Sequence, residues 1–208
     1  MNWISDILAP GNTTGWLVVA FLIVAISPIV YRLKARRMWL PYYMIASFAV
    51  TVILVSIARL TGFDQTLANM EAHIVTWLAN FIGIESSTTQ SGILISAEGG
   101  WSQLAVGIEC SAVLEMAVLI GLVMGFPAYS LTKRVSLTTL GLLATFVLNI
   151  GRLLLIVIII AVWDTPSAAF IAHAIIGRIV FFVGVVIIYW YLLTRTTLRF
   201  LIKEVTAR

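Results

Sequence analysis

The stretch "SLTTLGLLATFVLNIGRLLLIVIIIAVW", residues 136–163, decides the class of fold. A helix rises about 1.5 Å per residue, so a run of this length reaches across the ~30 Å hydrocarbon core of a bilayer. The only ionised side chain within the run is Arg152. The stretch therefore predicts a membrane-spanning helix with one unusual charge inside it.

Further apolar runs lie along the chain at residues 16–31, 39–58, 111–131 and 168–193. Of its 208 residues, 61% are hydrophobic and 11% are charged, and the mean hydropathy is +1.06. A soluble domain carries about 25% charged residues, so this composition excludes a soluble globule. We therefore predict a single all-α domain, residues 1–208, with five transmembrane helices and no cleavable signal peptide.

Basic residues are distributed unevenly among the loops. They follow the first, third and fifth runs, whereas residues 61–109 and 164–167 contain no lysine or arginine. Cytoplasmic loops of membrane proteins carry the excess of Lys and Arg. The alternation predicts a multi-pass plasma-membrane protein with its N-terminus outside and its C-terminus in the cytoplasm. Its net charge of +4 then reflects topology and does not indicate nucleic-acid binding.

Residues 61–109, expected on the outer face, are predicted to begin with an amphipathic helix. Residues 66–84 place large apolar side chains on one helical stripe, which is typical of a helix lying in the membrane interface. A sixth span is the alternative, but it would bury Glu71 and His73 and reverse every later loop against the charge rule. The stripe consists of Leu67, Met70, Ile74, Trp77, Leu78, Phe81 and Ile82.

The end of the same segment is predicted to form a short β-hairpin before the third span. In residues 92–109, two β-favouring stretches flank the turn sequence "AEGG". The hairpin leads to Cys110, the only cysteine of the chain, which therefore cannot form an internal disulfide.

Three reactive side chains fall in the outer half of the bilayer if this topology holds. Cys110 lies at the outer mouth of the third span. Arg152 lies about 16 Å below the outer end of the fourth span, and His173 lies about 8 Å inside the fifth. An imidazole helps a thiol to become a thiolate, and a guanidinium stabilises the negative charge that develops on an attacked carbonyl. Together these groups indicate an acyl-transfer site.

Each of these residues also has a structural interpretation. A lone cysteine in an apolar helix is often a small buried hydrophobe, and a histidine near a helix end is often a satisfied polar group. An arginine deep in a span is costly and points to function. Glu115 is expected to neutralise Arg152 or Arg178 as a buried ion pair.

Three short motifs, taken together, resemble the exosortase/archaeosortase family of polytopic membrane cysteine enzymes. They are "ECSA" at residues 109–112, "NIGR" at 149–152 and "HAIIG" at 173–177. The resemblance covers about half of the chain and extends to the basic "TKR" between the third and fourth runs. The short chain with "GIECSA" is similar to a compact subgroup associated with Gram-positive bacteria.

The resemblance implies a peptidase–transpeptidase that needs no metal or other cofactor. Its substrates would be exported proteins with a C-terminal recognition motif, a transmembrane helix and a basic tail. They would be cleaved just outside the membrane, and membrane lipids would be the other partners. Cys110 would be the nucleophile, His173 the base and Arg152 the group that stabilises the oxyanion. Supporting or substrate-orienting positions would be Asn149, Ser111, Glu115, Gly177 and Arg178.

Two positions depart from what the family pattern and thiol chemistry favour. Ala112 stands where many relatives have glycine, and Glu109 directly precedes the nucleophile. A carboxylate beside a thiol disfavours the thiolate, so we expect Glu109 to point away from the sulfur.

Two other classes of protein remain open from the sequence. One is a non-enzymatic membrane module, such as an envelope-assembly scaffold or a transporter subunit. The other is a membrane acyltransferase that uses a cysteine thioester.

Overall fold

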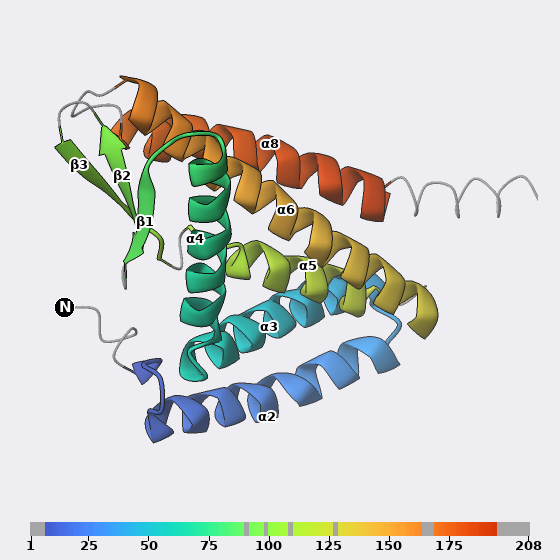
Figure 1. Ribbon diagram of the computed structural model, residues 1–208. Coiled ribbons are helices and arrows are strands. Elements are labelled where there is room, and N and C mark those ends of the chain that lie inside the picture. The colour runs from blue at the N-terminus through green and yellow to red at the C-terminus, as the bar shows by residue number, and fades with distance from the viewer. Residues whose placement is uncertain are drawn as a thin grey trace, which may run out of the picture. The chain divides into compact units, whose positions relative to one another are not determined.

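The computed structural model describes residues 7–89, 92–97, 100–107, 110–126, 129–163 and 169–194. The apolar runs form α2 (Thr13–Ala35), α3 (Trp39–Leu60), α5 (Val113–Gly125), α6 (Leu131–Trp163) and a C-terminal helix (Figure 1). The C-terminal helix consists of η1 (Ile171–Ile176), α8 (Gly177–Tyr189) and η2 (Trp190–Thr194). Within these described residues, four helices are long and apolar enough to cross a membrane, namely α2, α3, α6 and Ile171–Thr194.

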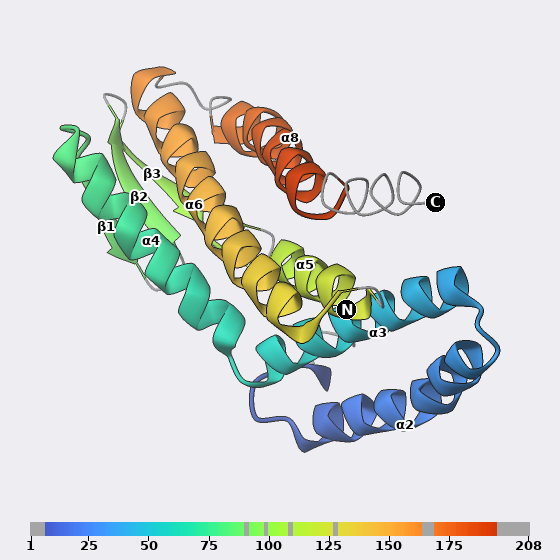
Figure 2. The same ribbon diagram turned by 90° about the vertical axis from the view of Figure 1, so that its right-hand side faces the viewer.

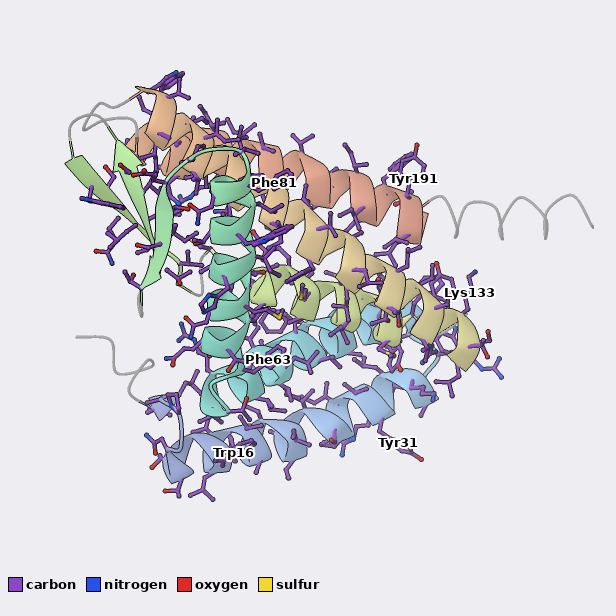
Figure 3. All side chains as sticks on the ribbon, viewed as in Figure 1. Trp16, Tyr31, Phe63, Phe81, Lys133 and Tyr191 are labelled. Atoms are coloured by element: carbon purple, nitrogen blue, oxygen red, sulfur yellow. The ribbon has the colours of Figure 1, made fainter. Side chains whose placement is uncertain are left out.

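The third predicted span is shorter than the sequence suggested. Its helix, α5, has 13 residues and rises only about 20 Å, less than the ~30 Å hydrocarbon core. The boundary with the fourth span also differs, because α6 begins at Leu131 and contains the basic residues that we had assigned to a loop. In this first turn, marked by Lys133 in Figure 3, the Arg134 guanidinium donates hydrogen bonds to the carbonyls of Phe126 and Tyr129.

The chain forms two compact units. One contains Met1–Leu67 and Val113–Leu140, and the other contains Ala68–Ala112 and Gly141–Arg208. In the first unit, Gly121 and Gly125 of α5 face Ser47 of α3, and a Cβ at either glycine would collide with Ser47. Small residues four apart let two transmembrane helices approach closely, which explains how α3 and α5 pack.

The second unit has a core built from four elements. These are α4 (Phe63–Phe81), the sheet, α6 and η1, and Cys110 also belongs to the core. Ala72 of α4 and Ala172 of η1 are both buried there. The apolar core residues of α6 are Ile150, Leu153, Ile156, Val157 and Ile160.

A three-stranded antiparallel sheet lies between α4 and Cys110 in the sequence. Its strands are β1 (Ser86–Thr89), β2 (Gly92–Ala97) and β3 (Gly100–Ala105), in the order β1-β2-β3. The predicted hairpin is β2–β3, whereas β1 was not predicted, because "SSTT" lacks the apolar alternation of a half-buried strand. The buried side chains of the sheet are Ile93, Ile95 and Leu104.

The predicted amphipathic helix is present as α4, but it packs differently from the expectation. Part of the large apolar stripe is exposed, including Trp77 and Phe81, whose rings stack (Phe81 is marked in Figure 3). Its other face is also apolar and packs into the core through Ala68, Ala72, Val75 and Ala79. Glu71 lies on this packed face and is fully buried, whereas His73 is exposed.

Candidate functional site

Cys110 is held in a tight turn between β3 and α5. The carbonyl oxygen of Gly107 accepts hydrogen bonds from the N–H groups of Cys110 and Ser111, each at 2.9 Å. Both side chains are buried, with 3% of Cys110 and 2% of Ser111 exposed. These contacts hold Cys110 in the core of the second unit.

His173 reaches the thiol from a distorted first turn of the C-terminal helix. The Cys110 Sγ lies 3.5 Å from Nε2 and 3.8 Å from Nδ1 of His173. His173 belongs to the π-helical η1, in which the N–H of Gly177 donates to the carbonyl of Ala172. Short π-helical insertions occur frequently at functional sites, because they rotate side chains out of the regular helical register.

Asn149 links Cys110 to α6. This side chain is fully buried, and its Nδ2 donates a hydrogen bond of 2.9 Å to the carbonyl oxygen of Cys110. A buried amide hydrogen bond fixes the backbone on which the thiol is carried. The structure thus brings together Cys110, His173 and Asn149, three of the residues that the sequence singled out.

Arg152 lies one helical turn after Asn149 on α6 and is almost fully buried, with 4% of its surface exposed. The central carbon of its guanidinium lies 5.0 Å from the ring centroid of Phe181, on α8. This distance is within the range of a cation–π contact, which stabilises a cation removed from water. A guanidinium buried in an apolar environment is suited to stabilising negative charge.

Gly177 sets how closely α8 approaches α6. A Cβ at Gly177 would lie 2.8 Å from the Cδ1 of Ile156 and 3.0 Å from the Ala172 carbonyl oxygen. Because Ile156 is fully buried, it has little space to move. The glycine therefore preserves the close helix contact directly beside the turn that carries His173.

We expect Gly177→Ala to lower the stability of the protein by about 1–3 kcal/mol, since overpacking a filled core costs this much. The matched control is Gly151→Ala on α6, where an added Cβ meets no atom within 4 Å. This control should keep or slightly raise stability, because alanine favours a helix. Thermal unfolding in detergent measures both variants, and equal Tm values would contradict the packing role of Gly177.

The remaining predicted site residues lie in different surroundings. Arg178 is exposed on α8, and Glu115 is half-buried in the first turn of α5, in the first unit. Pairing of Glu115 with Arg152 or Arg178 stays a prediction. Glu109 lies outside the described residues, so its expected orientation also stays a prediction. In the described part of the chain, no group of three or more His, Cys, Asp or Glu could hold a metal ion.

Two buried residues of the second unit were not assigned a role from the sequence. Phe181 could not be recognised, because its contact with Arg152 depends on how α6 and α8 pair. Glu71 did carry a signal, since a carboxylate interrupts the apolar positions Leu67, Ile74 and Leu78 of α4. Its complete burial in the core of the second unit places an acidic group where ionised residues normally need compensation.

These observations define a membrane protein in which a buried cysteine contacts a histidine, with an arginine and an asparagine on an adjacent helix. The family model for transmembrane exosortase (Exosortase_EpsH) matches residues 2–190. The chain therefore belongs to the transmembrane exosortase family. Neither a curated protein nor a solved structure shows significant similarity to it.

Proposed function

We propose that the protein is a membrane-embedded cysteine peptidase–transpeptidase with Cys110 as its nucleophile. The observation that carries this proposal is the distance of 3.5 Å between Cys110 Sγ and His173 Nε2. A nucleophile within hydrogen-bond reach of a base is the recurring arrangement of covalent acyl transfer. Membership of the exosortase family supports the same chemistry.

In the proposed reaction, His173 takes the thiol proton and the Cys110 sulfur attacks the carbonyl carbon of a substrate peptide bond. A C–S bond forms, and the negative charge on the carbonyl oxygen is stabilised by the Arg152 guanidinium. The C–N bond then breaks, and the leaving amine takes the proton from His173. A water or an amine then attacks the thioester carbonyl and gives a proton to His173. The C–S bond breaks, the departing sulfur takes this proton, and the acyl product is released or transferred.

The proposed substrate is an exported protein with a C-terminal motif, an apolar helix and a basic tail. Cleavage would occur at the extracytoplasmic face of the plasma membrane. The location is supported by the loop charges, because residues 61–109, which lead to Cys110, contain no lysine or arginine. The exposed aromatic pair Trp77 and Phe81 supports an interfacial position for α4, since such rings favour the headgroup region.

Comparison of C-terminal peptides from wild-type cells and Cys110→Ala cells tests this function. We expect a set of exported proteins to lose the apolar tail only in the wild type, as identified by mass spectrometry. Identical tails in both strains would contradict a peptidase and leave the non-enzymatic module as the better account. A Cys110-dependent lipid product without tail cleavage would instead indicate a membrane acyltransferase.

Asn149 is proposed as a positioning residue that acts through the Cys110 backbone. Asn149→Ala removes the donor to the Cys110 carbonyl, and we expect kcat to fall by about 10- to 100-fold, as for a misplaced nucleophile. KM should change little, and the rate of Cys110 alkylation by iodoacetamide should also change. The control is Thr145→Val, which alters a buried hydroxyl with no hydrogen-bond partner among the described residues. An equal loss in both variants would contradict the positioning role.

A further inference from the structure

The connection between α2 and α3, in the first unit, contains a basic turn formed by residues 32–37. Its cationic side chains are all exposed, and they are Arg32, Lys34, Arg36 and Arg37. Figures 1 and 2 show α2 and α3 as neighbouring helices that this connection joins. Residues 7–63 contain no aspartate or glutamate, so the two helices offer these cations no carboxylate.

Other cations at this end of the first unit have partners within the chain, whereas those of the basic turn do not. Arg134 donates to the carbonyls of Phe126 and Tyr129, and Lys133 lies 4.2 Å from the ring centroid of Tyr129. Phe126 also contacts Tyr43, near the start of α3, with the ring centroids 5.6 Å apart. The four side chains of the basic turn form no ion pair or hydrogen bond with any residue that the structure describes.

The dipole of α2 explains two of the four cations. Arg32 and Lys34 lie in the last turn of the helix, where positive side chains complement the partial negative charge of the helix C-terminus. Arg36 and Arg37 follow Ala35, the last residue of α2. The effect of the dipole is confined to the last turn, so these two arginines need a different explanation.

Arg37 occupies a backbone position that favours glycine. Its φ is +55°, and it is the only non-glycine residue with a positive φ among the described residues. The N–H of Arg37 donates to the carbonyl of Lys34 at 3.1 Å. The N–H of Met38 donates to the carbonyl of Leu33, also at 3.1 Å. These two bonds form a Schellman motif, in which the left-handed residue is usually glycine because a Cβ is strained there.

Membrane topology alone does not explain an arginine at this strained position. Orientation depends on the number of Lys and Arg residues in a loop, so a cation at any other position of the loop would serve it equally. An arginine retained where glycine would be more stable indicates that its guanidinium makes a contact outside the described residues. Guanidinium groups bind phosphate oxygens through paired N–H donors.

Aromatic side chains place the basic turn at the level of the lipid headgroups. Tyr31, marked in Figure 3, is 74% exposed near the end of α2, and Trp39 is 49% exposed at the start of α3. Trp and Tyr are enriched at this depth of a membrane. Both helices are long and apolar enough to cross a membrane, so the turn between them lies where lipid phosphates lie. Basic clusters of this size beside a membrane span attract anionic lipids.

We propose that the basic turn is a binding site for the phosphate group of an anionic phospholipid. Arg36 and Arg37 contact the phosphate, and Arg32 and Lys34 add to the positive potential around it. The bound lipid stabilises the pair of α2 and α3, because a ligand that binds only the folded protein raises its apparent stability. This site does not depend on the peptidase function proposed above.

Thermal unfolding of the full chain in vesicles of defined composition tests the site. We expect phosphatidylglycerol added to phosphatidylcholine to raise the wild-type Tm, and Arg37→Gln to lose about 2–4 °C of this rise, the scale of one cation at an anionic surface. The matched control is Arg59→Gln, which removes one positive charge from the last turn of α3 and should keep the full rise. Equal losses in the two variants would overturn the proposal, because they would show a general effect of net charge.

Arg37→Gly is expected to act in opposite directions in the two kinds of vesicle. In phosphatidylcholine alone its Tm should exceed that of the wild type, because glycine relieves the left-handed strain. With phosphatidylglycerol present, its rise should be as small as that of Arg37→Gln.

Three results would overturn the lipid site. The first is a full rise with phosphatidylglycerol in Arg37→Gly. The second is a rise that soluble glycerol phosphate reproduces in phosphatidylcholine vesicles, which would indicate a site for free phosphate. The third is an unchanged rise in Arg37→Gln together with the loss of a co-purifying protein, which would indicate an acidic protein segment as the partner.

Discussion

Cys110→Ser is expected to lower substrate processing by at least about a thousandfold, the scale of losing a covalent nucleophile. Serine keeps the size and polarity of the side chain, so the turn at Gly107 and the contact with His173 should persist. A hydroxyl is much harder to deprotonate than a thiol, and the attack on the peptide carbonyl therefore fails. The fall in the processing rate therefore reports the loss of the chemical step and not a folding defect.

The measurement is the rate at which identified substrates lose their apolar tails in cells or proteoliposomes. Gly151→Ala, in open space on α6, controls for general effects of substitution and should retain the wild-type rate. A Cys110→Ser protein that processes substrates within about tenfold of the wild-type rate would be incompatible with a thiol nucleophile.

His173→Ala is expected to lower the processing rate by about 10²- to 10⁴-fold, the usual contribution of a general base. The variant leaves Cys110 in place but removes the ring nitrogens that lie 3.5 and 3.8 Å from its sulfur. Alkylation of Cys110 by iodoacetamide should slow as well, because the thiol loses its proton acceptor and less thiolate forms.

Imidazole added to the His173→Ala protein separates chemistry from structure. His173 is partly exposed, so a free imidazole has access to the space that the variant leaves. We expect it to restore part of the activity, whereas acetate or benzene of similar size should not. Unchanged processing in His173→Ala without imidazole would show that another group activates the thiol.

Hydropathy predicted most of the long helices, because a bilayer requires an apolar helix of sufficient length for every span. The orientation read from loop charge stays a prediction. Hydropathy overestimated the length of α5, which ends at Gly125. It takes no account of Pro127, and helices usually end at or before the residue preceding a proline. The strand β1 was missed because "SSTT" is short and polar. Its place in the sheet depends on tertiary contacts, including the hydrogen bonds between Asn80 and Ser86.

The candidate site was predicted only in part, because some of its features follow from topology and others depend on tertiary contacts. Topology alone placed Cys110 and His173 on the same side of the membrane, and the structure shows them in contact. No sequence pattern indicated the π-helical turn that carries His173 or the stacking of Arg152 on Phe181. These features depend on how α8 packs against α6, which Gly177 makes possible through its contact with Ile156.

Trapping of the acyl-enzyme tests the central claim most directly. The membrane protein is isolated during substrate processing, digested and analysed by mass spectrometry for an adduct on Cys110. We predict a peptide from the substrate, ending at the cleavage site, joined to Cys110 by a thioester that hydroxylamine releases. It should be absent from Cys110→Ala and scarce in His173→Ala. Tail cleavage that proceeds at the normal rate with no thioester at Cys110 would contradict the account.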